Sequence, residues 1–141
     1  MTKKDFWKLC EKKYIYLDGA TGSNLQEKGL MAGECPETWI LDHPQALIEL
    51  QKAYVKAGTN ILYAPSFTAN RIKLAEYGLE ARLDEINRKL VALSKEAADG
   101  KALVAGDLTM TGQQLAPIGT LDFEELVDVY KEQIVSLVNA G

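Results

Sequence analysis

The chain has 141 residues, of which 47% are hydrophobic and 26% charged, and its formal net charge is −4. This composition is typical of one folded domain and argues against an intrinsically disordered chain. Basic residues are dispersed, so we expect no nucleic-acid partner, and no apolar run approaches the roughly 20 residues of a membrane span. The charged N-terminus lacks the apolar stretch of a secretory signal, and the two cysteines lack metal-ligand spacing, so the expected location is a reducing cytoplasm.

The predicted elements alternate between helix and strand. An extra amphipathic helix is expected near the N-terminus, with Cys10 as one of its small buried residues. Three short β-rich runs follow at intervals of roughly 45 residues, which suits one β-α unit each. They cover residues 14–19, 59–67 and 102–110, and their nearly continuous hydrophobicity predicts parallel strands buried on both faces.

Helical periods separate and follow these strands. Asn70 is expected to cap a short helix, Asp122 is expected to cap the last helix, and Cys35 is expected in a long loop. The spacing of apolar residues predicts helices over 47–57, 70–78, 83–97 and 123–138.

The order α-β-α-β-α-β-α defines an α/β protein with parallel strands. It fits either an open doubly wound sheet or part of a (β/α)8 barrel. The last residues, "VNAG", stand where the repeat would begin a fourth strand. We therefore expect residues 1–141 to be the N-terminal three β-α units of an incomplete barrel, whose exposed sheet edges would favour self-association.

Polar or glycine-rich residues follow each predicted strand directly. In parallel α/β folds the carboxyl ends of the strands meet at one edge, where ligands bind. A small polar ligand at that edge would meet side chains and backbone from all three strands. The candidate binding residues are Asp18, Gly19 and Ala20 after the first strand, Ser66 and Thr68 after the second, and Asp107 after the third.

The turn after the first strand, "DGATG", offers both signs of charge. Asp18 could pair with a cationic group, while the bare N–H groups that follow could hold an anionic one, and an amino acid carries both. A structural interpretation stays open, in which Asp18 caps the loop and the glycines only turn the chain. For Asp107 a structural hydrogen bond is equally plausible. Neither G-x-G-x-x-G nor G-K-S/T occurs here, so the turn lacks a nucleotide-phosphate motif.

Four segments resemble the homocysteine S-methyltransferase family, especially the homocysteine-binding domain of its cobalamin-dependent methionine synthase branch. They are "LDGATGSNLQEKG", "HPQALIELQKAYVKAGTNILYAPSFTANRIKLAEYGLE", "EINRKLVALSKEAA" and "ALVAGDLTMTGQQLAPIGT". The resemblance implies a (β/α)8 barrel, of TIM type, that transfers a methyl group to homocysteine and so forms methionine. It implies a zinc ion that lowers the thiol pKa of homocysteine, a methyl group carried by cobalamin, and partner domains that bind cobalamin and folate.

The resemblance also implies roles for individual residues. Asp18 would bind the ammonium group of homocysteine, and the N–H groups of Gly19 and Ala20 would lie near its carboxylate. The second-strand segment, usually Thr-Asn-Thr-Phe in the family, reads Ala-Pro-Ser-Phe here, although Ser66 and Thr68 could still line the pocket.

The family's three zinc-ligating cysteines lie late in the barrel, and neither Cys10 nor Cys35 matches them. The isolated chain is therefore expected to bind no zinc and to transfer no methyl group. Two other functions stay open. The chain could be a non-zinc α/β enzyme that binds a small anionic metabolite at the Asp18 turn, or a non-catalytic half-barrel that acts as an assembly module.

Overall fold

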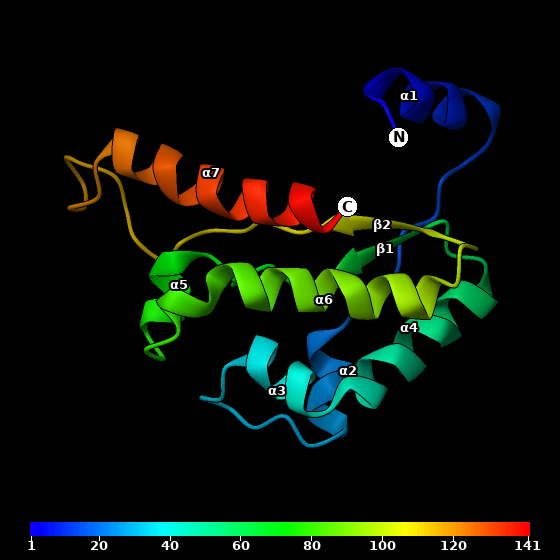
Figure 1. The fold of residues 1–141 in the computed structure, drawn as a ribbon, viewed down its shortest axis with the longest axis horizontal. Coiled ribbons are helices and arrows are strands. Elements are labelled where there is room, and N and C mark those ends of the chain that lie inside the picture. Colours follow the sequence, from blue (N-terminus) through cyan, green and yellow to red (C-terminus); the bar gives the residue numbers. More distant parts are fainter.

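A computed structural model describes all residues, 1–141, as an α/β fold with a small parallel sheet (Figure 1). None of its helices is both long enough and apolar enough to cross a membrane. The elements are α1 (Lys3–Lys12), α2 (Gly22–Glu27), α3 (Pro36–Asp42), α4 (Pro44–Ala57), β1 (Ile61–Ala64), α5 (Arg71–Ala75), the 3₁₀ helix η1 (Glu80–Arg82), α6 (Leu83–Ala98), β2 (Leu103–Gly106) and α7 (Phe123–Ala140).

The sheet has the parallel order that the sequence predicts, with shorter strands. β1 and β2 pair in parallel, with Ile61 opposite Leu103. The predicted first strand is reduced to one parallel bridge, between Leu17 and Ile61. The Tyr16 carbonyl accepts hydrogen bonds from the N–H groups of Asn60 and Ile61, at 2.8 and 3.2 Å. The three segments therefore lie side by side in chain order, with β1 in the middle.

The expectation that all three strands are buried on both faces is wrong. Tyr14 is 88% exposed, Tyr16 is 64% exposed and Leu17 is 49% exposed, and no residue of β2 is fully buried. Helices α4 and α6 pack against β1, and α6 also packs against β2, so one face of the sheet is covered. Nothing in the chain covers the exposed side chains of the first segment. Hydrophobic sequence predicts the tendency to be buried, but burial also needs a partner surface.

Helix α6 lies at the centre of the fold and contacts α3, α4, α7 and both strands. Most of its apolar stripe is buried, with Ile86 and Leu90 at 0% exposure. Acidic residues in its first turn, Asp84 and Glu85, suit the positive end of the helix dipole. The main core cluster joins this stripe to α2, α3, α4 and α5, so these helices are fixed relative to the strand ends.

Several local expectations are confirmed, and one, the burial of Cys10, is wrong. Asn70 caps α5, because its side chain accepts a hydrogen bond from the Lys73 N–H at 3.0 Å. Asp122 is the N-cap residue of α7, but its side chain makes no capping hydrogen bond. Helix α1 forms as predicted, yet none of its residues is buried, so Cys10 is not a core residue. Figure 1 shows α1 set apart from the other helices.

The segment expected to be a long loop contains a helix instead. Pro36 occupies the first turn of α3, where a proline lacks only an N–H that would stay unbonded. Cys35 is the N-cap residue of this helix and is only 6% exposed. Cys35 therefore lies in a loop as expected, but the loop is shorter than expected, because the apolar side chains of Trp39 and Ile40 anchor α3 to the core.

Candidate functional site

A cavity of about 320 Å³ lies at the carboxyl ends of the strands. Of the predicted site residues, it brings together Asp18, Gly19 and Asp107, which come from the first and third strand ends. This agrees with the rule that ligand sites in parallel α/β folds form where the strands end. The lining residues are Asp18, Gly19, Thr21, Gly22, Tyr63, Ala64, Pro65, Phe67 and Asp107.

Asp18 is held at the cavity by two hydrogen bonds to β1. Its N–H donates to the Ile61 carbonyl at 3.1 Å, and its carboxylate Oδ2 accepts from the Tyr63 N–H at 3.1 Å. Burial raises the pKa of Asp18 above its ordinary value, and the nearby negative charge of Asp107 raises it further, against the lowering effect of the N–H donors. Two acids and no basic side chain line the cavity, so its electrostatics favour a cationic group.

The turn after Asp18 is held through a carbonyl and leaves its N–H groups free. The Ala20 carbonyl accepts from the Tyr54 hydroxyl at 2.9 Å and from the Asn24 side-chain amide at 2.7 Å. No hydrogen bond within the chain uses the N–H group of Gly19 or Ala20. A Cβ atom on Gly19 would lie 2.9 Å from the Tyr54 hydroxyl oxygen, so a larger residue would require the Tyr54 ring to shift. Two fixed, unbonded donors beside an acid can bind a carboxylate.

Ser66 lies behind the cavity wall and does not line the cavity. It is fully buried, and its hydroxyl donates to the Asp107 carbonyl at 2.9 Å while accepting from the Asp107 N–H at 3.1 Å. Its own carbonyl accepts from the Gln133 side chain of α7 at 2.7 Å. Ser66 therefore ties the end of β1 to the end of β2 and fixes the backbone of Asp107.

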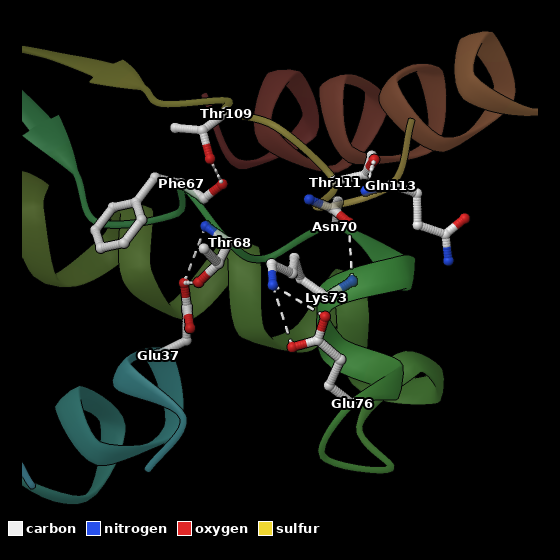
Figure 2. A network of polar contacts seen from close by, with 9 residues as sticks. All are labelled: Glu37, Phe67, Thr68, Asn70, Lys73, Glu76, Thr109, Thr111 and Gln113. Atoms are coloured by element: carbon white, nitrogen blue, oxygen red, sulfur yellow. Dashed lines mark hydrogen bonds and ion pairs between the residues drawn. The ribbon is translucent and has the colours of Figure 1, made fainter. Parts of the chain in front are cut away.

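Thr68 does not line the cavity, and Figure 2 shows its side chain beside Glu37 of α3. Its N–H donates to the Glu37 carboxylate at 3.1 Å, and its hydroxyl donates to the same oxygen. The preceding residue, Phe67, lines the cavity, and its carbonyl accepts from the Thr109 hydroxyl at 2.9 Å. Both hydroxyls that were expected at the pocket, those of Ser66 and Thr68, are thus already bonded within the protein.

The candidate residues did not include Tyr63, Pro65 and Phe67, which form one wall of the cavity. Tyr63 lies on β1, and Pro65 and Phe67 lie in the turn that follows Ala64. Their position at the end of a predicted strand was the signal that could have found them. Glu37 was also missed, because nothing in its helix points to a partner that lies 31 residues further along the chain.

The cysteines do not fit the zinc ion that the resemblance implies. Cys35 is buried and donates its thiol to Glu37 over 3.5 Å, and burial raises the pKa of this thiol, which disfavours the thiolate that binds metal. Cys10 lies in the separate helix α1. No group of three or more His, Cys, Asp or Glu side chains is arranged to hold a metal ion. We therefore assign no metal ligand within this chain.

Comparison with known proteins defines the class to which this fold and cavity belong. The family model described as homocysteine S-methyltransferase matches residues 15–141. The chain therefore belongs to the homocysteine S-methyltransferase family. The match begins at the first strand segment and takes in every residue that lines the cavity.

Individual relatives show how the chain compares in length. It is 23% identical over 149 residues to the methionine synthase of Mycobacterium tuberculosis, an alignment that covers 97% of this chain and 12% of that protein. Its fold matches the oxidized form of the homocysteine methyltransferase MmuM from Escherichia coli with a TM-score of 0.78 and 21% identity, covering 94% of this chain and 52% of that one. The metallated form of MmuM gives a TM-score of 0.77 and 22% identity, with 95% and 53% covered. The chain thus spans about half of these solved structures and a much smaller share of the synthase.

Proposed function

We propose that the chain forms the amino-acid-binding part of a homocysteine S-methyltransferase of the methionine synthase type, the enzyme class that methylates homocysteine to methionine. The observation that carries this proposal is the turn in which Asp18 and Gly19 line the cavity, while the N–H groups of Gly19 and the adjacent Ala20 are unbonded. The parallel order of the three strand segments supports their assignment as β-α units of a (β/α)8 barrel. The free thiols of Cys10 and Cys35 agree with a reducing cytoplasm as the expected location.

In this proposal each residue at the strand ends has a defined task. Asp18 binds the ammonium group of homocysteine, and Asp107 adds negative charge on the same side of the cavity. The N–H groups of Gly19 and Ala20 bind the carboxylate. Ser66 and Thr68 support the cavity from behind, since their hydroxyls are already bonded to Asp107 and to α3.

The chemistry of methyl transfer belongs to the whole protein in this proposal. Zinc would activate the homocysteine thiol, methylcobalamin would supply the methyl group, and cobalamin- and folate-binding domains would be the partners. Because the cysteines of this chain do not fit a zinc ion, its residues bind and orient homocysteine without a metal step of their own. We expect the isolated chain to bind no zinc and to form no methionine when methylcobalamin is supplied.

Equilibrium dialysis with three probes tests the binding proposal. L-Homocysteine has both charged groups, 4-mercaptobutanoate lacks the ammonium group, and 3-mercaptopropylamine lacks the carboxylate. We expect binding of homocysteine to exceed that of either analogue, and Asp18→Asn to weaken homocysteine binding most. If 4-mercaptobutanoate bound as well as homocysteine, the site would be one for anionic metabolites, as in the alternative of a non-zinc α/β enzyme. The two acids that line the cavity argue against that outcome.

A second candidate function, assembly through exposed surfaces, rests on α7. Its outer face carries large apolar side chains that are exposed, and Phe123 and Val138 reach 64% and 70%. Exposed apolar patches favour association. Sedimentation velocity with and without homocysteine would distinguish the two candidate functions. Dimers whose amount does not change with homocysteine would favour an assembly module. The exposed residues of α7 are Phe123, Val127, Ile134, Val135 and Val138.

A further inference from the structure

Glu37 is a buried acid that no cation accompanies. Its side chain lies on α3 and is only 1% exposed. Burying a carboxylate is costly unless hydrogen bonds replace the lost water. Its donors are the N–H and hydroxyl of Thr68 and the thiol of Cys35, all of them uncharged groups. A buried carboxylate that depends on these hydrogen bonds holds its donor groups firmly in place. If a donor moved away, the carboxylate would be left without a hydrogen-bond partner.

The partner that matters most is Thr68, because it follows the wall of the cavity. Pro65 and Phe67 line the cavity, and Thr68 is the next residue along the chain. Figure 2 shows the Glu37 carboxylate reaching from α3 to the backbone and hydroxyl of Thr68, while Thr109 bonds to the Phe67 carbonyl from the other side. Ser66 is bonded to Asp107 and α7, and Phe67 is bonded to Thr109, so Glu37 supplies the bonds that hold the Thr68 end of this segment from α3.

We propose that Glu37 is a positioning residue for the substrate cavity. Its carboxylate anchors Thr68, and through Thr68 it holds the aromatic ring of Phe67 as a wall of the cavity. The identity of the ligand rests on the proposed function, whereas the anchoring of the segment does not. The anchor requires an acceptor oxygen rather than a negative charge, so a glutamine should replace the glutamate and an alanine should not.

Two variants of the full chain and one control separate this role from ordinary packing. Glu37→Ala removes the acceptor, and Glu37→Gln retains one. Ile40→Ala removes a buried apolar side chain from the same helix and no hydrogen-bonding group. Amide hydrogen exchange, read by NMR at Thr68 and normalised to Leu62 in β1, reports the anchor. Titration with L-homocysteine reports the cavity.

We expect Glu37→Ala to accelerate exchange at Thr68 by roughly tenfold or more and to weaken homocysteine binding by about tenfold, because bonds to a charged acceptor are lost. Glu37→Gln should stay within about threefold of the original chain in both measurements, since a neutral acceptor makes a bond of ordinary strength. Ile40→Ala should lower the global stability while leaving the normalised exchange and the affinity unchanged.

The proposal is overturned if Glu37→Ala matches Ile40→Ala at Thr68, or if exchange accelerates while homocysteine binding stays the same. If the original chain binds no homocysteine, the proposed function fails, and the exchange comparison still decides whether Glu37 anchors the segment. If Glu37→Ala does not fold, Thr68→Val removes the hydroxyl donor alone. It should accelerate exchange at residue 68 by roughly threefold, and unchanged exchange would overturn the proposal.

Discussion

The first two strand ends look alike in the sequence and differ in the structure. In the turn from Asp18 to Gly22, the Asp18 carboxylate lines the cavity, and the N–H groups of Gly19 and Ala20 have no partner within the chain. The segment from Pro65 to Asn70 uses both of its hydroxyls and four of its backbone groups in bonds to α3, α6, α7 and the segment after β2. A polar residue at a strand end can bind a ligand only through polar atoms that the protein itself leaves unbonded, as it leaves Oδ1 of Asp18.

The difference has a physical cause in where each segment lies. Residues 65–70 lie among packed helices, where every polar group needs a partner within the protein. The Asp18 turn lies at the open edge of the sheet, where Gly19 and Ala20 are exposed and water or a ligand can bond to them. The buried segment therefore acts as a rigid wall, and the exposed turn supplies the groups that recognise the ligand.

The largest effects should come from apolar packing, and they should be similar in the two regions. Leu25 follows the Asp18 turn in α2, Leu74 follows the second segment in α5, and each is 1% exposed. Leu25→Ala and Leu74→Ala should each lower the free energy of unfolding by about 2–5 kcal/mol. Urea denaturation measures both. A cost below about 1 kcal/mol for Leu25→Ala would show that the first region is loosely packed as well.

Polar substitutions should separate the two regions clearly. Asn87 on α6 is fully buried and donates to the Ala69 carbonyl at 2.8 Å, so Asn87→Ala leaves that carbonyl without a partner and should cost about 1–3 kcal/mol. Asn24 donates to the Ala20 carbonyl in an exposed bond, and Asn24→Ala should cost under about 0.5 kcal/mol because water replaces it. Equal costs in urea titrations would contradict the comparison.

Gly19→Ala tests the tight fit of the exposed turn against Tyr54. The new methyl group would lie too close to the Tyr54 ring, so the ring must move and weaken its bond to the Ala20 carbonyl. We expect a loss of about 1 kcal/mol in the free energy of unfolding. In a double-mutant cycle with Tyr54→Phe, the two losses should not add, because both act on one contact. If the two losses in free energy of unfolding were additive, Gly19 and the Tyr54 ring would not be in contact.

The smallest effect on stability should come from Asp18, and its sign is informative. The pKa of Asp18 is raised in the folded chain, so folding disfavours its charged form. This term favours the folded chain below the ordinary pKa of 3.8 and is lost as the pH rises through the raised pKa. Asp18→Asn should therefore be slightly more stable than the original chain at pH 7, with no advantage at pH 3. Thermal unfolding at both pH values measures this, and a destabilised variant at pH 7 would contradict it.

The parallel order of strands, the helices α4, α6 and α7, and the Asp18 turn could be predicted from the sequence. Each of them depends on a local hydrophobic period or on turn chemistry. The sequence could not distinguish Ser66 and Thr68 from Asp18, since their partners Asp107 and Glu37 lie 41 and 31 residues away. Spacing along the chain does not reveal such contacts. The exposure of Tyr14 and Tyr16 was missed for a related reason, because a hydrophobic pattern does not show whether a partner surface exists.

The most direct test of the account is an NMR titration of the chain with L-homocysteine, followed through the backbone amides. We expect the N–H signals of Gly19 and Ala20 to shift first and furthest. The Tyr63 signal should follow, because its N–H donates to Asp18, and Asp18→Asn should abolish these shifts. Shifts confined to residues away from the cavity, or identical shifts with 4-mercaptobutanoate, would contradict it.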